Sequence, residues 1–73
     1  MISLNDYANL RSYAGSETAV MLENRYHHGV FARDDADVTS QDNGVTLLVD
    51  AQNRRWKRII NDGDYSIDWW LSL

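Results

Sequence analysis

The densest group of potential metal ligands in this chain is a run of three aspartates between positions 34 and 37. Clustered carboxylates suit Ca²⁺ or Mg²⁺, because both ions prefer oxygen ligands. A calcium-binding EF-hand loop that began at Asp35 would need a glycine near position 40 and a glutamate near position 46, but Ser40 and Thr46 stand there. We therefore predict no metal site, and we expect these aspartates to cap a turn or to pair with arginines. The three residues are Asp34, Asp35 and Asp37.

The other residues that could do chemistry are not arranged for it. His27 and His28 are adjacent, so on a strand they would point to opposite sides and could not bind one ion. We expect them in a solvated turn. A pH-sensitive contact is the alternative, because histidine titrates near neutral pH. No nucleophile elbow and no glycine-rich phosphate loop is present. The sequence therefore predicts no catalytic residue, no cofactor and no enzyme.

A basic segment with an aromatic residue at its centre runs from Arg54 to Arg58. Basic side chains around an aromatic ring can hold nucleic acid through phosphate contacts and base stacking. Strand alternation would divide these charges between two faces, and the chain carries eleven acidic residues against seven basic ones. We therefore expect the arginines to pair with aspartates, and we do not expect nucleic acid as a partner. The expected acidic residues are Asp34, Asp35, Asp37 and Asp50.

Three tryptophans offer flat apolar surfaces on which a sugar ring could stack, although in a small domain such residues more often belong to the core. We expect Trp56 and Trp69 to be buried. Trp70 falls on the opposite face of the expected last strand, so it should be exposed or covered by a partner chain. The candidate interaction surface consists of Trp70, Asp34, Asp35, Asp37, Arg55 and Arg58.

Composition indicates one small domain over residues 1–73. There is no cysteine, which excludes disulfides and thiolate metal sites. The net charge of −4 argues against a general nucleic-acid binder. No apolar run approaches the roughly 20 residues of a membrane span, and the first residues lack the features of a signal peptide. The initial Met1 favours a free-standing protein over a fragment.

The segment around which the fold should be organised runs from Asp42 to Ile60, and its pattern predicts a turn, a strand, a second turn and a second strand. Asp42-Asn43-Gly44 can supply the positive φ values of a tight turn, and Asn53 suits a left-handed conformation in the second turn. Side chains that alternate between two faces fit a pair of strands. Because a lone hairpin is marginal in water, the rest of the chain must cover it.

The remaining elements are one helix and three further strands. Ser3 followed by Asp6 resembles a helix-capping pattern, so we predict a helix over residues 3–14 that stops at Gly15. Strands are predicted over residues 18–22 and 29–33, which form a hairpin, and over residues 65–71. The polar segment from position 34 to position 44 is predicted to be a loop. The fold class is therefore α+β, a small and mainly antiparallel sheet of about five strands with one N-terminal helix.

Four segments together carry a resemblance to a known family. They are LRSYAG at 10–15, GVFARDDAD at 29–37, DNGVTLLVDA at 42–51 and RRWKR at 54–58. In this order and spacing they resemble the small module that precedes the right-handed parallel β-helix in bacteriophage tailspikes and related prophage proteins of the pectate-lyase superfamily. Val45 departs from that pattern, because the family commonly has a second glycine there. No β-helix follows Leu73, so no residue that degrades polysaccharide is carried over.

The resemblance implies a non-enzymatic structural or adaptor module of a phage or prophage protein, which acts through protein–protein contacts. It implies self-association, with a homotrimer as the expected assembly, and a location in the virion or the bacterial cytoplasm. Two alternatives stay open. One is a carbohydrate-binding module that holds a polysaccharide with an exposed tryptophan, and the other is a small prophage-encoded regulator that binds a host protein.

Overall fold

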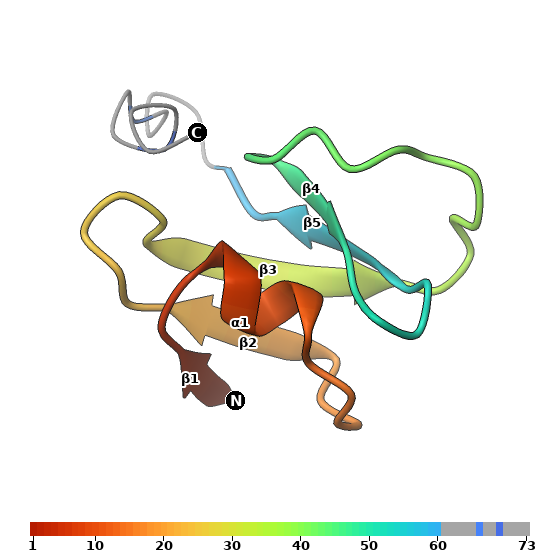
Figure 1. Cartoon of the computed structure of the whole chain (residues 1–73), viewed down its shortest axis with the longest axis horizontal. Helices are drawn as coiled ribbons and strands as arrows, with labels where there is room; N and C mark the ends of the chain where they lie inside the picture. Colours follow the sequence, from red (N-terminus) through yellow and green to blue (C-terminus); the bar gives the residue numbers. More distant parts are fainter. Residues whose placement is uncertain (61–65, 67–68, 70–73) are drawn as a thin grey trace.

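The computed structural model describes residues 1–60, Ser66 and Trp69. In this part of the chain a five-stranded sheet carries one short helix (Figure 1). The strands lie in the order β1-β2-β3-β5-β4, with β1 parallel to β2 and every other pair antiparallel. The predicted α+β class, with a mainly antiparallel sheet, is confirmed. The elements are β1 (Ile2–Leu4), α1 (Tyr7–Arg11), β2 (Ala19–Leu22), β3 (Gly29–Asp34), β4 (Leu47–Val49) and β5 (Arg55–Arg58).

The predicted hairpin at the centre of the chain is present as β4 and β5. Leu48 lies opposite Trp56 across the pair, and neither side chain has any solvent exposure. The turns contain the two predicted positive φ angles, 83° at Gly44 and 64° at Asn53. Local turn chemistry therefore sets the register of this hairpin, and burial of the Leu48–Trp56 pair reinforces it.

The second predicted hairpin, β2 with β3, is also present. Val20 lies opposite Phe31, and both are fully buried. Gly29 begins β3 at a φ of 139°, and a Cβ placed there would lie 2.5 Å from Nη1 of Arg58. Any side chain at this position would therefore meet both backbone strain and a steric clash. Because β3 pairs with β5, the two hairpins join into one sheet with β5 next to its edge strand.

The N-terminal prediction was partly wrong, because the helix is shorter than residues 3–14. Ile2–Leu4 forms β1 instead, and it pairs in parallel with β2. Asp6, at a φ of −146°, is the N-cap residue of α1, and its side chain accepts a hydrogen bond from the amide of Asn9 at 2.9 Å. The helix ends at Arg11, with Ser12 as its C-cap residue, and does not extend to Gly15. Strand pairing and partial burial of the first apolar residues thus prevail over a weak helical pattern.

The strand predicted over residues 65–71 lies outside the described residues except at Ser66 and Trp69. Trp69 has a helical backbone, so the strand assignment is wrong at that position. Its side chain is buried, as predicted. The position of Trp70 also lies outside the described residues.

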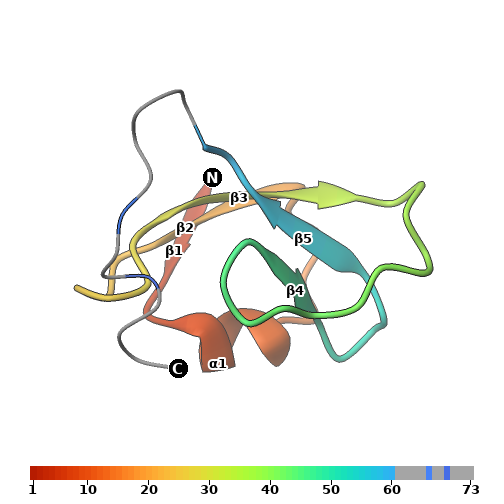
Figure 2. The same ribbon diagram turned by 90° about the horizontal axis from the view of Figure 1, so that it is seen from above.

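The core lies between the sheet and α1, which covers one face of the sheet (Figure 2). The helix contributes Tyr7 and Leu10, and Tyr7 meets Phe31 edge to face with their ring centroids 6.4 Å apart. Since the described part of the chain has only this one helix, no helix covers the opposite face of the sheet. The buried cluster is Tyr7, Leu10, Val20, Leu22, Phe31, Leu48 and Trp56.

Candidate functional site

The basic segment that sequence analysis singled out is strand β5, and each of its side chains bonds to another part of the domain. Arg54, just before the strand, donates from Nε to Oδ2 of Asp50 at 2.7 Å and from its terminal nitrogens to the carbonyls of Tyr13 and Gly15. The indole of Trp56 donates to the same Asp50 oxygen at 2.8 Å. These bonds fasten the end of the α1 segment to the β4–β5 hairpin.

Asp50 accepts these hydrogen bonds from a position without solvent exposure of its side chain. Burial by itself would raise the pKa of Asp50, but hydrogen bonds from Trp56 and Arg54 favour the charged form and hold the pKa below its usual value. Asp50 is therefore a buried anion that holds Arg54 and Trp56 in place. The predicted pairing of Arg54 with Asp50 is confirmed.

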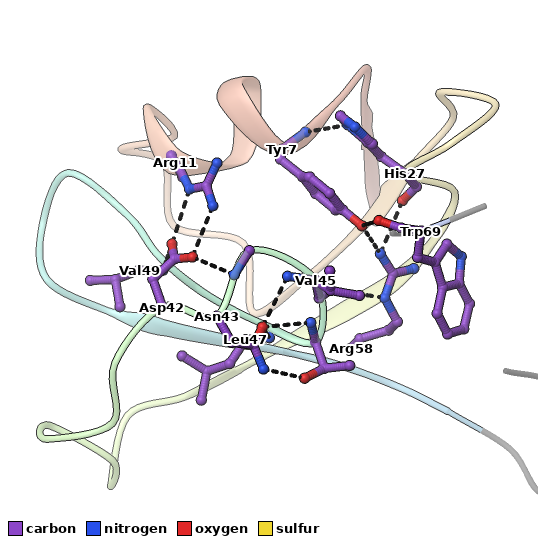
Figure 3. Close-up of polar contacts among 12 residues, drawn as sticks. Tyr7, Arg11, His27, Asp42, Asn43, Val45, Leu47, Val49, Arg58 and Trp69 are labelled. Atoms are coloured by element: carbon purple, nitrogen blue, oxygen red, sulfur yellow. Dashed lines mark hydrogen bonds and ion pairs between the residues drawn. The ribbon is translucent and has the colours of Figure 1, made fainter. Parts of the chain in front are cut away.

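Arg58 is the most enclosed cation of this segment. Its guanidinium lies 4.6 Å from the ring centroid of Phe31 and 4.0 Å from that of Trp69. Figure 3 shows Arg58 beside Tyr7 and Trp69. It donates to the hydroxyl of Tyr7 at 2.8 Å and to the carbonyl of Val45 at 3.1 Å. It also donates to the carbonyls of both histidines in the β2–β3 turn. This one side chain thus connects the first helix, two loops and Trp69.

Arg55 and Lys57 hold the polar loop that follows β3. Arg55 donates from Nε to the carbonyl of Ser40 at 3.0 Å, and it is only 8% exposed. Lys57 contacts Asp34 at 2.8 Å and Asp37 at 3.1 Å. Hydrogen bonds from Ser40 and Lys57 lower the pKa of Asp37. The loop is therefore tied to β5 at Asp37 and Ser40, and the last residue of β3, Asp34, is tied to β5 as well.

The predicted pairings and the predicted surface can now be compared with these contacts. Asp35 pairs with Arg33 at 2.8 Å. Asp34 and Asp37 pair with Lys57 rather than with an arginine. Arg55 and Arg58 are buried, because their guanidinium groups bond to backbone carbonyls inside the domain. These two arginines do not belong to an exposed surface, and including them in the candidate interaction surface was an error of the sequence interpretation.

His27 is not in the solvated environment that was predicted for it. Its ring stacks on Tyr7 with the centroids 3.7 Å apart, and Nδ1 accepts a hydrogen bond from the Tyr7 amide at 3.0 Å. Burial lowers the pKa of His27; Asp6 raises it in part, and the nearby cations Arg58 and Arg11 lower it again. The neighbouring His28 is exposed, in line with the prediction for the pair.

The face of the sheet opposite α1 is a feature that sequence analysis did not identify. Residues that lie opposite each other in the registers share a face, and Met21 lies opposite Val30, while Ala32 lies opposite Lys57. Ile59 continues this row, and its amide bonds to the carbonyl of Val30 at 2.8 Å. Met21 is 37% exposed and Ile59 is 53% exposed. We call this set the outward face; its side chains are Ala19, Met21, Val30, Ala32, Leu47, Lys57 and Ile59.

Nothing in the geometry of the described residues suggests catalysis. Within residues 1–60 there is no pocket, and no three potential metal ligands come together. The described part of the chain has no helix of the length and apolar character that crossing a membrane requires. The described part of the chain therefore offers surfaces rather than a cleft.

Comparison with known proteins places these features in a family. The family model of the phage tail protein small four-stranded beta-sheet domain matches residues 3–62, and the chain belongs to this family. Among solved structures, the chain is similar to the tailspike protein of Acinetobacter baumannii phage AM24. The two are 34% identical with a TM-score of 0.67, over 80% of this chain and 11% of the tailspike chain. No curated protein matches the chain. The resemblance to a small tailspike module is confirmed.

Proposed function

We propose that this chain is a non-enzymatic structural or adaptor module of a phage or prophage protein, and that it acts through protein–protein contacts. Membership of a phage tail domain family carries the proposal. In the similar tailspike the module accounts for only 11% of the chain, as expected of a part that connects or positions larger parts. The absence of a pocket among the described residues agrees with a role in assembly.

The outward face is the contact surface that we propose. It presents apolar side chains next to Lys57, whose charge is already balanced by Asp34 and Asp37. A basic surface for nucleic acid is therefore not available on this face. An exposed apolar patch of this kind suits another protein surface. The partner that we propose is a further copy of the same chain, with a homotrimer as the assembly.

Sedimentation equilibrium across a range from about 10 µM to about 1 mM would test self-association. We expect the mass to rise from the monomer value of 8.4 kDa towards three times that value. Ile59→Glu should keep the protein monomeric, because the charge would be buried in the interface. Val38→Glu is the matched control, since Val38 is 65% exposed on the loop and lies outside the outward face. A monomer at every concentration, or equal effects of both variants, would contradict the proposal.

The carbohydrate-binding alternative receives no support from the described tryptophans. Trp56 has no exposed surface and Trp69 is 5% exposed, so neither indole offers a face to a sugar ring. Trp70 lies outside the described residues, so the test uses Trp70→Phe: titration of this variant with a polysaccharide should leave its tryptophan fluorescence unchanged.

A further inference from the structure

Strand β4 forms one edge of the sheet, and its sequence makes that edge prone to pairing with a strand of another chain. The residues from Thr46 to Val49 are threonine, two leucines and valine, an uncharged segment with strong strand propensity. The amide of Arg58 donates to the carbonyl of Thr46, and the amide of Asp50 donates to that of Arg54, so these alternate positions face β5. Leu47 and Val49 therefore direct their amides away from the sheet, where an edge strand normally offers them to another chain.

Both outward amides are already occupied by side chains of the preceding turn (Figure 3). The amide of Leu47 donates to Oδ1 of Asn43 at 3.0 Å, and the amide of Val49 donates to Oδ2 of Asp42 at 3.0 Å. The carbonyl of Leu47 accepts from the amide of Asn43, also at 3.0 Å. Two consecutive residues thus take three of the hydrogen-bonding positions that a neighbouring strand would use.

The two residues are themselves held in place. Oδ1 of Asn43 also accepts from the amides of Val45 and Thr46, and its Nδ2 contacts the Thr46 hydroxyl. The carboxylate of Asp42 receives two hydrogen bonds from Arg11 of α1, at 2.8 and 3.0 Å. A bidentate arginine–carboxylate pair fixes orientation as well as charge. The helix on the core side of the sheet therefore anchors the residue that covers its edge.

We propose that Asp42 and Asn43 form a strap that closes the β4 edge and prevents this strand from pairing with the edge strand of a second copy of the chain. The strap limits the ways in which copies can meet, because extension of the sheet at β4 would require both side chains to leave. The proposal stands apart from the proposed function, since it holds whether or not the outward face binds another copy.

Amide hydrogen exchange of the wild-type protein tests the strap directly. We expect the Leu47 and Val49 amides to exchange at least about 100-fold more slowly than in an unstructured peptide, although they face away from the sheet. Asn43→Ala should remove protection at Leu47 while Val49 stays protected, and Asp42→Ala should do the reverse. Asn43→Asp keeps the accepting oxygen and should preserve protection at Leu47. Rapid exchange of both amides in the wild type, while Leu48 is protected, would overturn the proposal.

Association of the variants at high concentration tests the consequence. Thioflavin T fluorescence and light scattering should rise for Asp42→Ala and Asn43→Ala within hours at about 0.5 mM, at which the wild type stays clear. Asp34→Ala is the matched control for Asp42→Ala, because it also removes one negative charge, at the end of β3, without touching β4. If a variant fails to fold by circular dichroism, Arg11→Ala replaces it, since this change releases only the anchor of Asp42 and should weaken protection at Val49 alone. Equal solubility of the edge variants and Asp34→Ala would refute the strap.

Discussion

Asp50→Asn should destabilise this domain more than its small change in volume suggests. Oδ1 of Asp50 accepts from the amides of Gln52 and Arg54, and Oδ2 accepts from Nε of Arg54 and Nε1 of Trp56. All four donors converge on a side chain without solvent exposure. An asparagine has only one oxygen, so its amino group must face either the two backbone donors or the two side-chain donors.

The magnitude follows from the donors that would lose an acceptor. A buried donor without a partner costs about 1–3 kcal/mol, which applies to the indole of Trp56. Arg54 would lose its charged partner, but its side chain is 17% exposed and its guanidinium keeps two carbonyl acceptors, so water offsets part of that loss. We expect a decrease of about 3 kcal/mol in the free energy of unfolding. A domain of this size has a total of roughly 4–11 kcal/mol, so the loss is a large fraction of its stability.

Guanidinium denaturation followed by tryptophan fluorescence measures the change. Asp34→Asn is the control, because the Asp34–Lys57 pair is exposed on both sides and an exposed ion pair adds little to stability. Trp56→Phe in both backgrounds completes a double-mutant cycle that isolates the contact between the indole and the carboxylate. If Asp50→Asn lies within about 0.5 kcal/mol of the control, the assignment of Asp50 as the central acceptor is wrong.

Further predictions concern two residues around Arg58. Gly29→Ala should lower the free energy of unfolding by about 1–3 kcal/mol in the same assay, because an alanine at a φ of 139° is strained and its Cβ would meet Arg58; an unchanged midpoint would refute this account. Because folding lowers the pKa of His27, its contribution to stability is present above the ordinary value of 6.5 and is lost as pH falls through the folded value. Denaturation at several pH values should show this loss in the wild type and not in His27→Phe, whereas an equal slope in both proteins would exclude His27 as its source.

The parts of the fold that sequence analysis predicted correctly are those that local chemistry determines. Asn53 and Gly44 are among the few residues suited to positive φ, and the alternating segments beside them pair as two strands. Burial of Trp56 was predicted for the same kind of reason, since a large aromatic side chain in a small domain has few exposed alternatives. These signals lie within about ten residues of the structure that they specify.

The parts that were missed depend on contacts between distant positions. Ile2–Leu4 forms a strand only because β2 lies beside it, and a parallel pairing leaves no turn signal in the sequence. The burial of Arg55 and Arg58 depends on hydrogen bonds to backbone carbonyls. These carbonyls belong to residues that are 13 to 30 positions away along the chain. The outward face likewise becomes visible only when the registers place Met21, Val30 and Ile59 side by side.

The location of the basic residues explains how so small a domain can hold its loops without disulfides. A short sheet and a helix of five residues leave long connections that bury little apolar surface. Hydrogen bonds from charged donors to carbonyls are stronger than neutral ones, and the four cations between positions 54 and 58 fasten three connections. Arg54 reaches the segment after α1, Arg55 and Lys57 reach the loop after β3, and Arg58 reaches the β2–β3 turn. The basic segment from Arg54 to Arg58, which most resembles a nucleic-acid site, therefore holds the domain together. Any partner must be recognised by the surfaces that this strand leaves free.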